Sequence, residues 1–197
     1  LEGDLLAGDY IWPKLIIENS FVTTATNQQT NGSLPTDLVK IIDETLWNRD
    51  LKVPVYGPLS PRIWQAQKGI GITSIYPSFR IKNGYFWFDP APSAGETIYY
   101  EYVSSKWCET SGAVGQTAWG ADSDVSRLPP EVMTLGLVWR WLEAKGFDYS
   151  NRYDEWRKQK AQAQAQSSPR RHLSIIGPPY GYTPSAPFLT EGSWSIT

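Results

Sequence analysis

The sequence is poor in the side chains that most catalytic and metal sites need. Among its 197 residues there is one cysteine, Cys108, and one histidine, His172. A single cysteine excludes a disulfide within the chain, and a zinc site needs several cysteine or histidine ligands. Only His172 could activate the Cys108 thiol, and only through the fold. Because His172 follows Arg170 and Arg171 in a proline-broken tract, we expect it to be solvated or in an interface.

The acidic pairs are also poor candidates for a catalytic or metal-binding site. Asp122 and Asp124 fall in a loop rich in glycine and serine, where hydrogen bonding within turns is their expected role. Asp43 and Glu44 are adjacent, and neighbouring side chains on a strand or helix diverge, whereas a glycosidase-type acid–base pair must converge. The sequence therefore predicts a protein that is not an enzyme, with no catalytic, cofactor-binding or metal-binding residues and no cofactor.

Charge and long hydrophobic runs are also scarce. Charged residues make up 19% of the chain, below the ~25% that is usual for soluble domains. No apolar run is long enough to span a membrane, and the first residues do not form a signal peptide. The net charge is -2, with an acidic excess in residues 1–126 and a basic excess in 127–171. Such an acidic body argues against sequence-specific DNA binding, but it suits a surface that DNA slides past.

Aromatic residues, in contrast, are abundant. There are ten tryptophans and eleven tyrosines. Large rings with a polar edge bury much area and suit both cores and protein interfaces. Composition alone does not decide whether these rings form a large core or a protein interface.

Turn and cap signals predict the elements of the first half. Residues 1–9 resemble the last turns of a helix that begins before the sequence, and Trp12-Pro13 ends it. Residues 15–22 form a strand, 34–48 are ambiguous between helix and strand, and 53–58 are extended. Ser60 caps a short helix that Gly69 stops.

The clearest local signal is a hairpin around Asn83-Gly84, because both turn residues favour positive φ. We expect the cross-strand pairs to be Ile81 with Phe86, Phe79 with Phe88, Arg80 with Trp87, and Lys82 with Tyr85. Residues 97–103 should add a third strand, and 106–127 should be a long loop.

Two helices follow, at 130–146 and at 148–166. The first carries two apolar stripes, one through Val132, Leu135, Trp139 and Leu142, and one through Met133, Leu137, Trp141 and Ala144. A surface helix of a monomer needs only one stripe, so we predict that this helix contacts a neighbouring subunit. The predicted interface residues are Met133, Leu137, Trp141, Tyr153 and Trp156.

Residues 167–197 contain five prolines together with many apolar side chains. Prolines disfavour helix and central strand, and a disordered tail is usually poor in apolar groups. We therefore predict an extended arm laid over a partner. Its expected anchors are Arg170, Arg171, Leu173, Ile175, Ile176, Tyr180, Tyr182, Phe188, Leu189 and Trp194.

Four segments, taken in order, resemble head-to-tail adaptor (head completion or connector) proteins of short-tailed phages. They are LPTDLVKIIDETLWNRDLKVPVYGPLSPRIWQ, FRIKNGYFWFDPAP, YYEYVSSKW and WGADSDVSRLPPEVMTLGLVWRWLEAKGFDYS, and the resemblance covers roughly residues 10–160. It implies an α+β fold, a helical bundle with a small antiparallel β-sheet domain inserted at about 15–104. The adaptor domain would be residues 1–166, with the extended C-terminal arm at 167–197.

The resemblance also implies partners. The chain would form a homo-oligomeric ring of twelve copies in the neck of a phage particle assembled in the host cytoplasm. The ring would bind the portal protein through the arm and a tail tube or nozzle protein on its other side. Genome DNA would pass through the lumen without sequence-specific binding, and no membrane would be involved.

Two alternatives stay open. A tail-associated peptidoglycan hydrolase would need carboxylates from Asp43, Glu44, Asp122 and Asp124 to converge in a cleft. A carbohydrate-binding module would need an exposed aromatic platform, for which Tyr85, Trp87 and Trp107 are the candidates.

Overall fold

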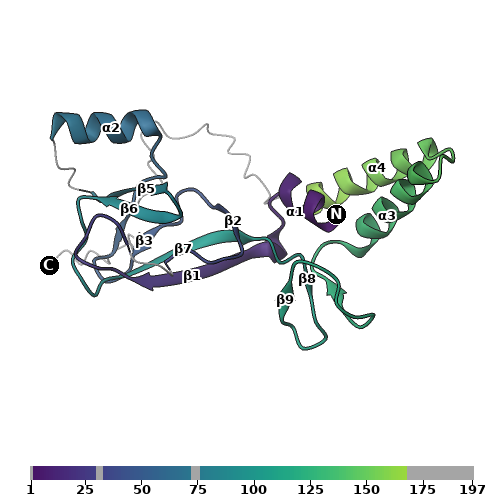
Figure 1. The fold of residues 1–197 in the computed structure, drawn as a ribbon, viewed down its shortest axis with the longest axis horizontal. Coiled ribbons are helices and arrows are strands. Elements are labelled where there is room, and N and C mark those ends of the chain that lie inside the picture. The colour runs from purple at the N-terminus through teal and green to yellow at the C-terminus, as the bar shows by residue number, and fades with distance from the viewer. Residues whose placement is uncertain (1, 30–32, 72–75, 168–197) are drawn as a thin grey trace, which may run out of the picture. The chain divides into compact units, whose positions relative to one another are not determined.

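A computed structural model of the chain describes residues 2–29, 33–71 and 76–167 (Figure 1). The α+β class is confirmed, and every strand ladder among these residues is antiparallel. The helices are α1 (Glu2–Asp9), the 3-10 turn η1 (Pro13–Leu15), α2 (Pro61–Ile70), α3 (Pro130–Ala144) and α4 (Ser150–Ser167). None of these described helices combines the length and the hydropathy needed to cross a membrane. The predicted arm lies outside the described residues beyond Ser167, and the helical-bundle description stays a prediction.

The long strand β7 (Thr97–Ser104) is the centre of the main sheet. It pairs along one edge with β1 (Ile16–Val22), from Ile16 opposite Val103 to Val22 opposite Thr97. Along its other edge lie β2 (Leu38–Ile41) and β3 (Trp47–Asn48), and β3 pairs in turn with β4 (Val53–Pro54). The ambiguous segment 34–48 is thus two short strands, and the strand predicted at 15–22 is confirmed.

The hairpin of β5 (Ser78–Lys82) and β6 (Tyr85–Asp89) has the predicted register in all four predicted pairs. Its turn residues Asn83 and Gly84 have φ values of 53° and 74°. The prediction that residues 97–103 extend this hairpin is wrong, because β7 pairs with β1, β2 and β3 instead. The hairpin packs its apolar face against that sheet, with the rings of Phe86 and Tyr100 5.3 Å apart. Face-to-face packing buries the aromatic rings of the hairpin and of the main sheet. If β7 had instead joined the edge of the hairpin, these rings would be exposed.

The described residues form two hydrophobic cores. The first lies between the hairpin and the main sheet and includes Phe79, Phe86, Phe88, Ile98, Tyr100 and Tyr102. The second joins α1, α3 and α4 and includes Leu6, Trp12, Trp107, Leu128, Val132, Met133, Trp139 and Trp156. The hairpin and the main sheet thus share one core, while Val103 of β7 and Cys108 of β8 belong to the second.

Two further predictions need correction. The segment 106–127 is not a structureless loop, because it forms a small sheet of β8 (Cys108–Glu109), β9 (Gly115–Gln116) and β10 (Val125–Ser126). Helix α2 is capped by Ser60 as predicted, but it continues through Gly69 and ends at Gly71, which has a φ of 69°. A glycine stops a helix only where its left-handed conformation is used, and at Gly69 it is not.

Asp37 ties β2 to β7 through its carboxylate. Ser104 Oγ and Tyr102 Oη donate hydrogen bonds to it, and Lys106 Nζ lies 3.8 Å away. Burial by itself would raise the pKa of Asp37, but the bonds from Ser104 and Tyr102 and the charge of Lys106 outweigh it, so the pKa is lowered. Burial and the same carboxylate raise the pKa of Tyr102 to about 12.

Asp37→Asn is expected to reduce the free energy of unfolding at neutral pH by about 1–3 kcal/mol. Because the folded-state pKa lies below the unfolded value of about 4, the stabilisation is present above that pH and is lost as pH falls through the lower folded-state pKa. Urea unfolding at pH 7, 4 and 3 would measure this, and the variant should lose less stability on acidification. The same dependence on pH in both proteins would contradict the assignment.

Candidate interaction surface

Helices α3 and α4 are joined by a tight turn built on Gly146. Gly146 has a φ of 72°, its backbone N–H donates to Glu143 O, and the N–H of Phe147 donates to Leu142 O. This pair of bonds is a Schellman motif, in which a glycine ends the helix and the next residue is apolar. Phe147 is thereby placed against the last turn of α3, with its ring 6.1 Å from that of Trp141.

An aromatic cluster holds the two helices together. The ring of Trp139 lies 5.2 Å from Tyr153 and 5.7 Å from Trp156. The guanidinium of Arg140 stands 4.4 Å above the Trp139 ring, and Lys160 Nζ stands 4.9 Å from the centre of the Trp156 ring. Each ring pair contributes about 0.5–1.5 kcal/mol beyond the area that it buries, so the pairs that Trp139 makes with Tyr153 and Trp156 pack α3 firmly on α4.

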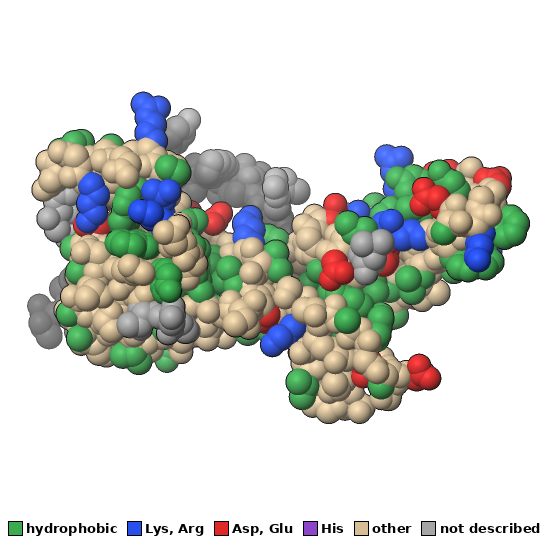
Figure 2. All heavy atoms as spheres, in the orientation of Figure 1, with side chains coloured by type: hydrophobic (Ala, Val, Ile, Leu, Met, Phe, Trp, Pro, Cys, Tyr) green, Lys and Arg blue, Asp and Glu red, His purple; other side chains and the backbone are tan. Residues whose placement is uncertain are grey.

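The opposite side of α3 is exposed and apolar. Val132, Met133, Gly136 and Trp139 face the core, while Leu137, Val138 and Trp141 are 54%, 38% and 57% exposed. At 100° per residue, these three exposed side chains cover an arc of roughly 100°. Together with Leu142 they line a groove of about 580 Å³, which we call the α3 groove. Figure 2 shows hydrophobic side chains at the α3–α4 end of the molecule.

The five predicted interface residues separate into two groups. Met133 and Trp156 are buried in the core of the chain itself, so their burial needs no neighbour. Leu137, Trp141 and Tyr153 remain exposed. Phe147, which is 57% exposed, belongs with them. The sequence signal for Phe147 was the Gly146-Phe147 pair itself, a helix-ending glycine followed by an apolar residue.

The acidic residues and the cysteine considered as catalytic candidates lie in separate places among the described residues. Asp124 accepts hydrogen bonds from the backbone N–H groups of Gly120 and Ala121, which lower its pKa, as the turn interpretation predicts. Asp43 and Glu44 are exposed in the turn between β2 and β3, and Glu44 has a φ of 65°. Burial, with Asp124 adding to it, raises the pKa of the Cys108 thiol. His172 lies outside the described residues, as do all ten residues predicted for the arm.

The aromatic platform of the carbohydrate alternative is also not formed. Trp107 is buried in the helical core, at 3% exposed, while Tyr85 and Trp87 lie on β6. Within the described ranges, no group of three or more histidine, cysteine, aspartate or glutamate residues could hold a metal ion.

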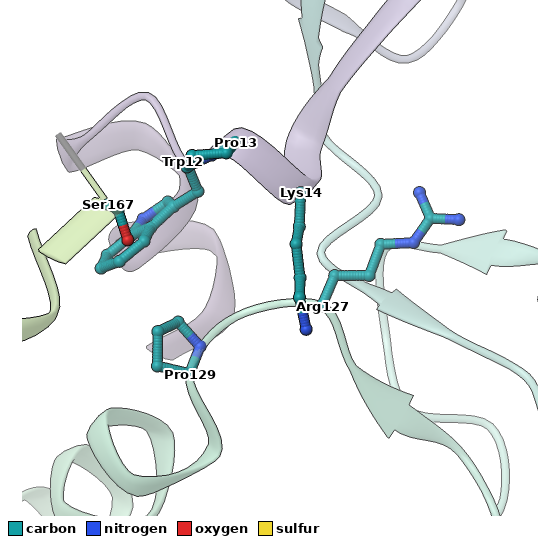
Figure 3. A pocket seen from close by; sticks show the side chains of 6 residues that line it. All are labelled: Trp12, Pro13, Lys14, Arg127, Pro129 and Ser167. Carbon is teal, nitrogen blue, oxygen red and sulfur yellow. The ribbon is translucent and has the colours of Figure 1, made fainter. Parts of the chain in front are cut away.

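A second pocket lies where α1, the start of α3 and the end of α4 meet (Figure 3). It measures about 400 Å³ and is lined by Trp12, Pro13, Lys14, Arg127, Pro129 and Ser167. The guanidinium of Arg127 pairs with Glu109 at 2.8 Å and points away from Lys14 (Figure 3). The pocket therefore does not present two free cations to an anionic ligand.

Comparison with protein families identifies a related family. The family model described as SU10 adaptor protein matches residues 8–175 of the chain. No curated protein matches it.

Proposed function

The chain belongs to the SU10 adaptor protein family, and on this premise we propose that it is a structural subunit of a phage neck. In the proposed role, copies of the chain form a ring between the portal and the tail, seal the joint and surround part of the channel through which the genome leaves. The ring has twelve copies, and the tail-side partner is a tube or nozzle protein. No catalytic step is part of this role.

The observation that carries the proposal is the exposed apolar arc of α3. Contiguous apolar surface of this kind marks interaction sites on soluble proteins, and each large side chain that an interface buries contributes about 1.5–3 kcal/mol. Leu137, Trp141 and Phe147 are each more than half exposed in the single chain. We therefore assign the ring interface to this arc, and we add Tyr153, which is 38% exposed on α4.

The charge distribution fits a channel that DNA passes through. Residues 1–126 carry more acidic than basic side chains. A protein that grips DNA needs a strongly basic face, because phosphate contacts supply most of the affinity. A weakly acidic wall would let the duplex slide, as ejection requires.

The arm is the proposed attachment to the portal. Its prolines favour extended backbone, and its apolar and basic side chains would act as spaced anchors on a partner surface. The proposed contacts are the ten residues named for the arm above. In this proposal, residues 1–166 form the ring and residues 167–197 bind the portal.

Deleting residues 168–197 is expected to abolish binding to purified portal while leaving the fold and the ring intact. The reason is that both described cores lie within residues 2–167. Pull-down with portal, together with circular dichroism and thermal melting, would measure both properties. A full-length variant in which Tyr180, Tyr182 and Trp194 are replaced by serine is a less drastic test, and it should also lose portal binding. Undiminished portal binding, or loss of folding on deletion, would count against this role for the arm.

A further inference from the structure

A second exposed aromatic site lies on the small sheet of β8, β9 and β10. Trp119 stands on the loop between β9 and β10 and packs edge-on against Trp107, with 5.4 Å between the ring centres. This contact leaves Trp119 46% exposed. Asp122, three residues further on, is exposed as well. We call Trp119 and Asp122 the tip.

The tip is held rigidly. One carboxylate oxygen of Asp124 accepts the N–H groups of Gly120 at 2.7 Å and Ala121 at 2.9 Å, and Gln116 Nε2 donates to the same oxygen. The loop that carries Trp119 and Asp122 is therefore fixed by its own hydrogen bonds. A preorganised tryptophan loses little conformational entropy on binding, and tryptophan is among the residue types enriched at energetic hot spots of interfaces.

The tip and the α3 groove are built on different elements that both pack around α1. A Cβ at Gly3 of α1 would overlap the Trp107 ring, so one side of α1 packs directly on the tryptophan that supports the tip. A Cβ at Gly136 would overlap Glu2, so α1 also packs on the core side of α3. The α3 groove is on the opposite side of α3 from that contact. One chain therefore carries the two sites on separate elements, so the two sites do not overlap.

Charge matches the two sites to each other. The exposed arc of α3 ends at Lys145, and the tip carries Asp122. Within the described part of the chain, neither residue has an ion-pair partner. The groove, at about 580 Å³, is shallow and open to solvent.

We propose that Trp119 of one copy inserts into the α3 groove of the next copy, with Asp122 beside Lys145. This rests on the ring of the proposed function and specifies its contact. Two different patches on each chain make the contact heterologous, and repetition of a heterologous contact gives a ring when the rotation between neighbours closes. The α3 groove is then the receiving half of the interface and the tip is the inserted half.

Charge reversal gives a direct test. Asp122→Lys and Lys145→Asp are each expected to raise the protein concentration for half-maximal ring assembly at least about tenfold, because like charges then meet at every contact. An equimolar mixture of the two variants should recover assembly, because alternating copies restore opposite charges at both kinds of contact. Asp43→Lys and Lys52→Asp, at two exposed turn positions of the main sheet, are matched controls and should assemble as the wild type does. Mass photometry would follow each case.

Wild-type assembly by both single variants would overturn the proposal, and so would failure of the mixture to recover rings. Cross-linking provides a readout that does not depend on stable rings. A variant with Asp122→Cys and Lys145→Cys, treated with a short bismaleimide, should give a ladder of dimers, trimers and larger species. A variant with only one of the two introduced cysteines should give no ladder, since the native Cys108 is buried.

Absence of a ring and absence of the tip–groove contact give different experimental results. If the wild-type chain forms no ring, alone or with portal, the proposed function is wrong. The cross-linked ladder still decides whether tip and groove meet. If rings form but the double-cysteine variant gives no ladder, the ring stands and this contact is wrong.

Discussion

Leu137→Asp is expected to convert the assembled ring into monomers without unfolding the chain. Leu137 is 54% exposed, so the folded monomer tolerates a carboxylate there. In the ring the same carboxylate would be buried against apolar surface with no partner, which costs several kcal/mol at every subunit contact. Sedimentation velocity would show the loss of the large species, and circular dichroism would show the unchanged fold.

The matched control for this experiment is Leu51→Asp. Leu51 is 57% exposed, so the chemical change and the exposure are nearly the same, but it lies beside the strands. The control should leave the ring unchanged. If rings persist with Leu137→Asp, or if Leu51→Asp abolishes them equally, α3 is not part of the subunit interface.

Phe86→Ala is expected to give the largest loss of stability among single substitutions in the strands. Phe86 is fully buried, and its ring lies 5.2 Å from Phe21, 5.6 Å from Phe79 and 5.3 Å from Tyr100. Truncation removes apolar contacts and leaves a cavity, at a cost of about 3–5 kcal/mol. Urea unfolding monitored by tryptophan fluorescence would measure the shift in midpoint.

Tyr85→Ala serves as the control for Phe86→Ala. Tyr85 is the preceding residue on β6, but it faces the other side of the hairpin and is only half-buried. Its truncation should cost about 1 kcal/mol, near the average for point substitutions. A smaller loss for Phe86→Ala than for Tyr85→Ala would mean that the hairpin does not pack on the main sheet as described.

The parts of the fold that sequence predicts well are those whose signals are local. The Asn83-Gly84 turn sets the hairpin register, because positive φ at both positions restricts the pairing to one alignment. Ser60 before Pro61, and Gly146 after the last turn of α3, mark helix ends through groups that lie within a few residues. In each case the chemistry that decides the structure is contained in one short segment.

The parts that sequence predicts poorly depend on distant partners. Nothing within residues 97–103 indicates that β7 pairs with β1, some 80 residues earlier, rather than with the adjacent hairpin. The two-residue strands of 106–127 are too short for an alternating pattern. On α3, both apolar stripes look alike in sequence, and only packing against α1 and α4 shows that Met133 lies inside while Leu137 and Trp141 lie outside.

The most direct test of the account is the mass of the purified protein, measured alone and then mixed with portal. A subunit whose α3 arc needs a neighbour should appear as a closed oligomer of defined copy number, twelve in our proposal, and should bind the portal as one unit. A protein that stays monomeric at every concentration, with and without portal, would show that the apolar arc of α3 is not a ring interface.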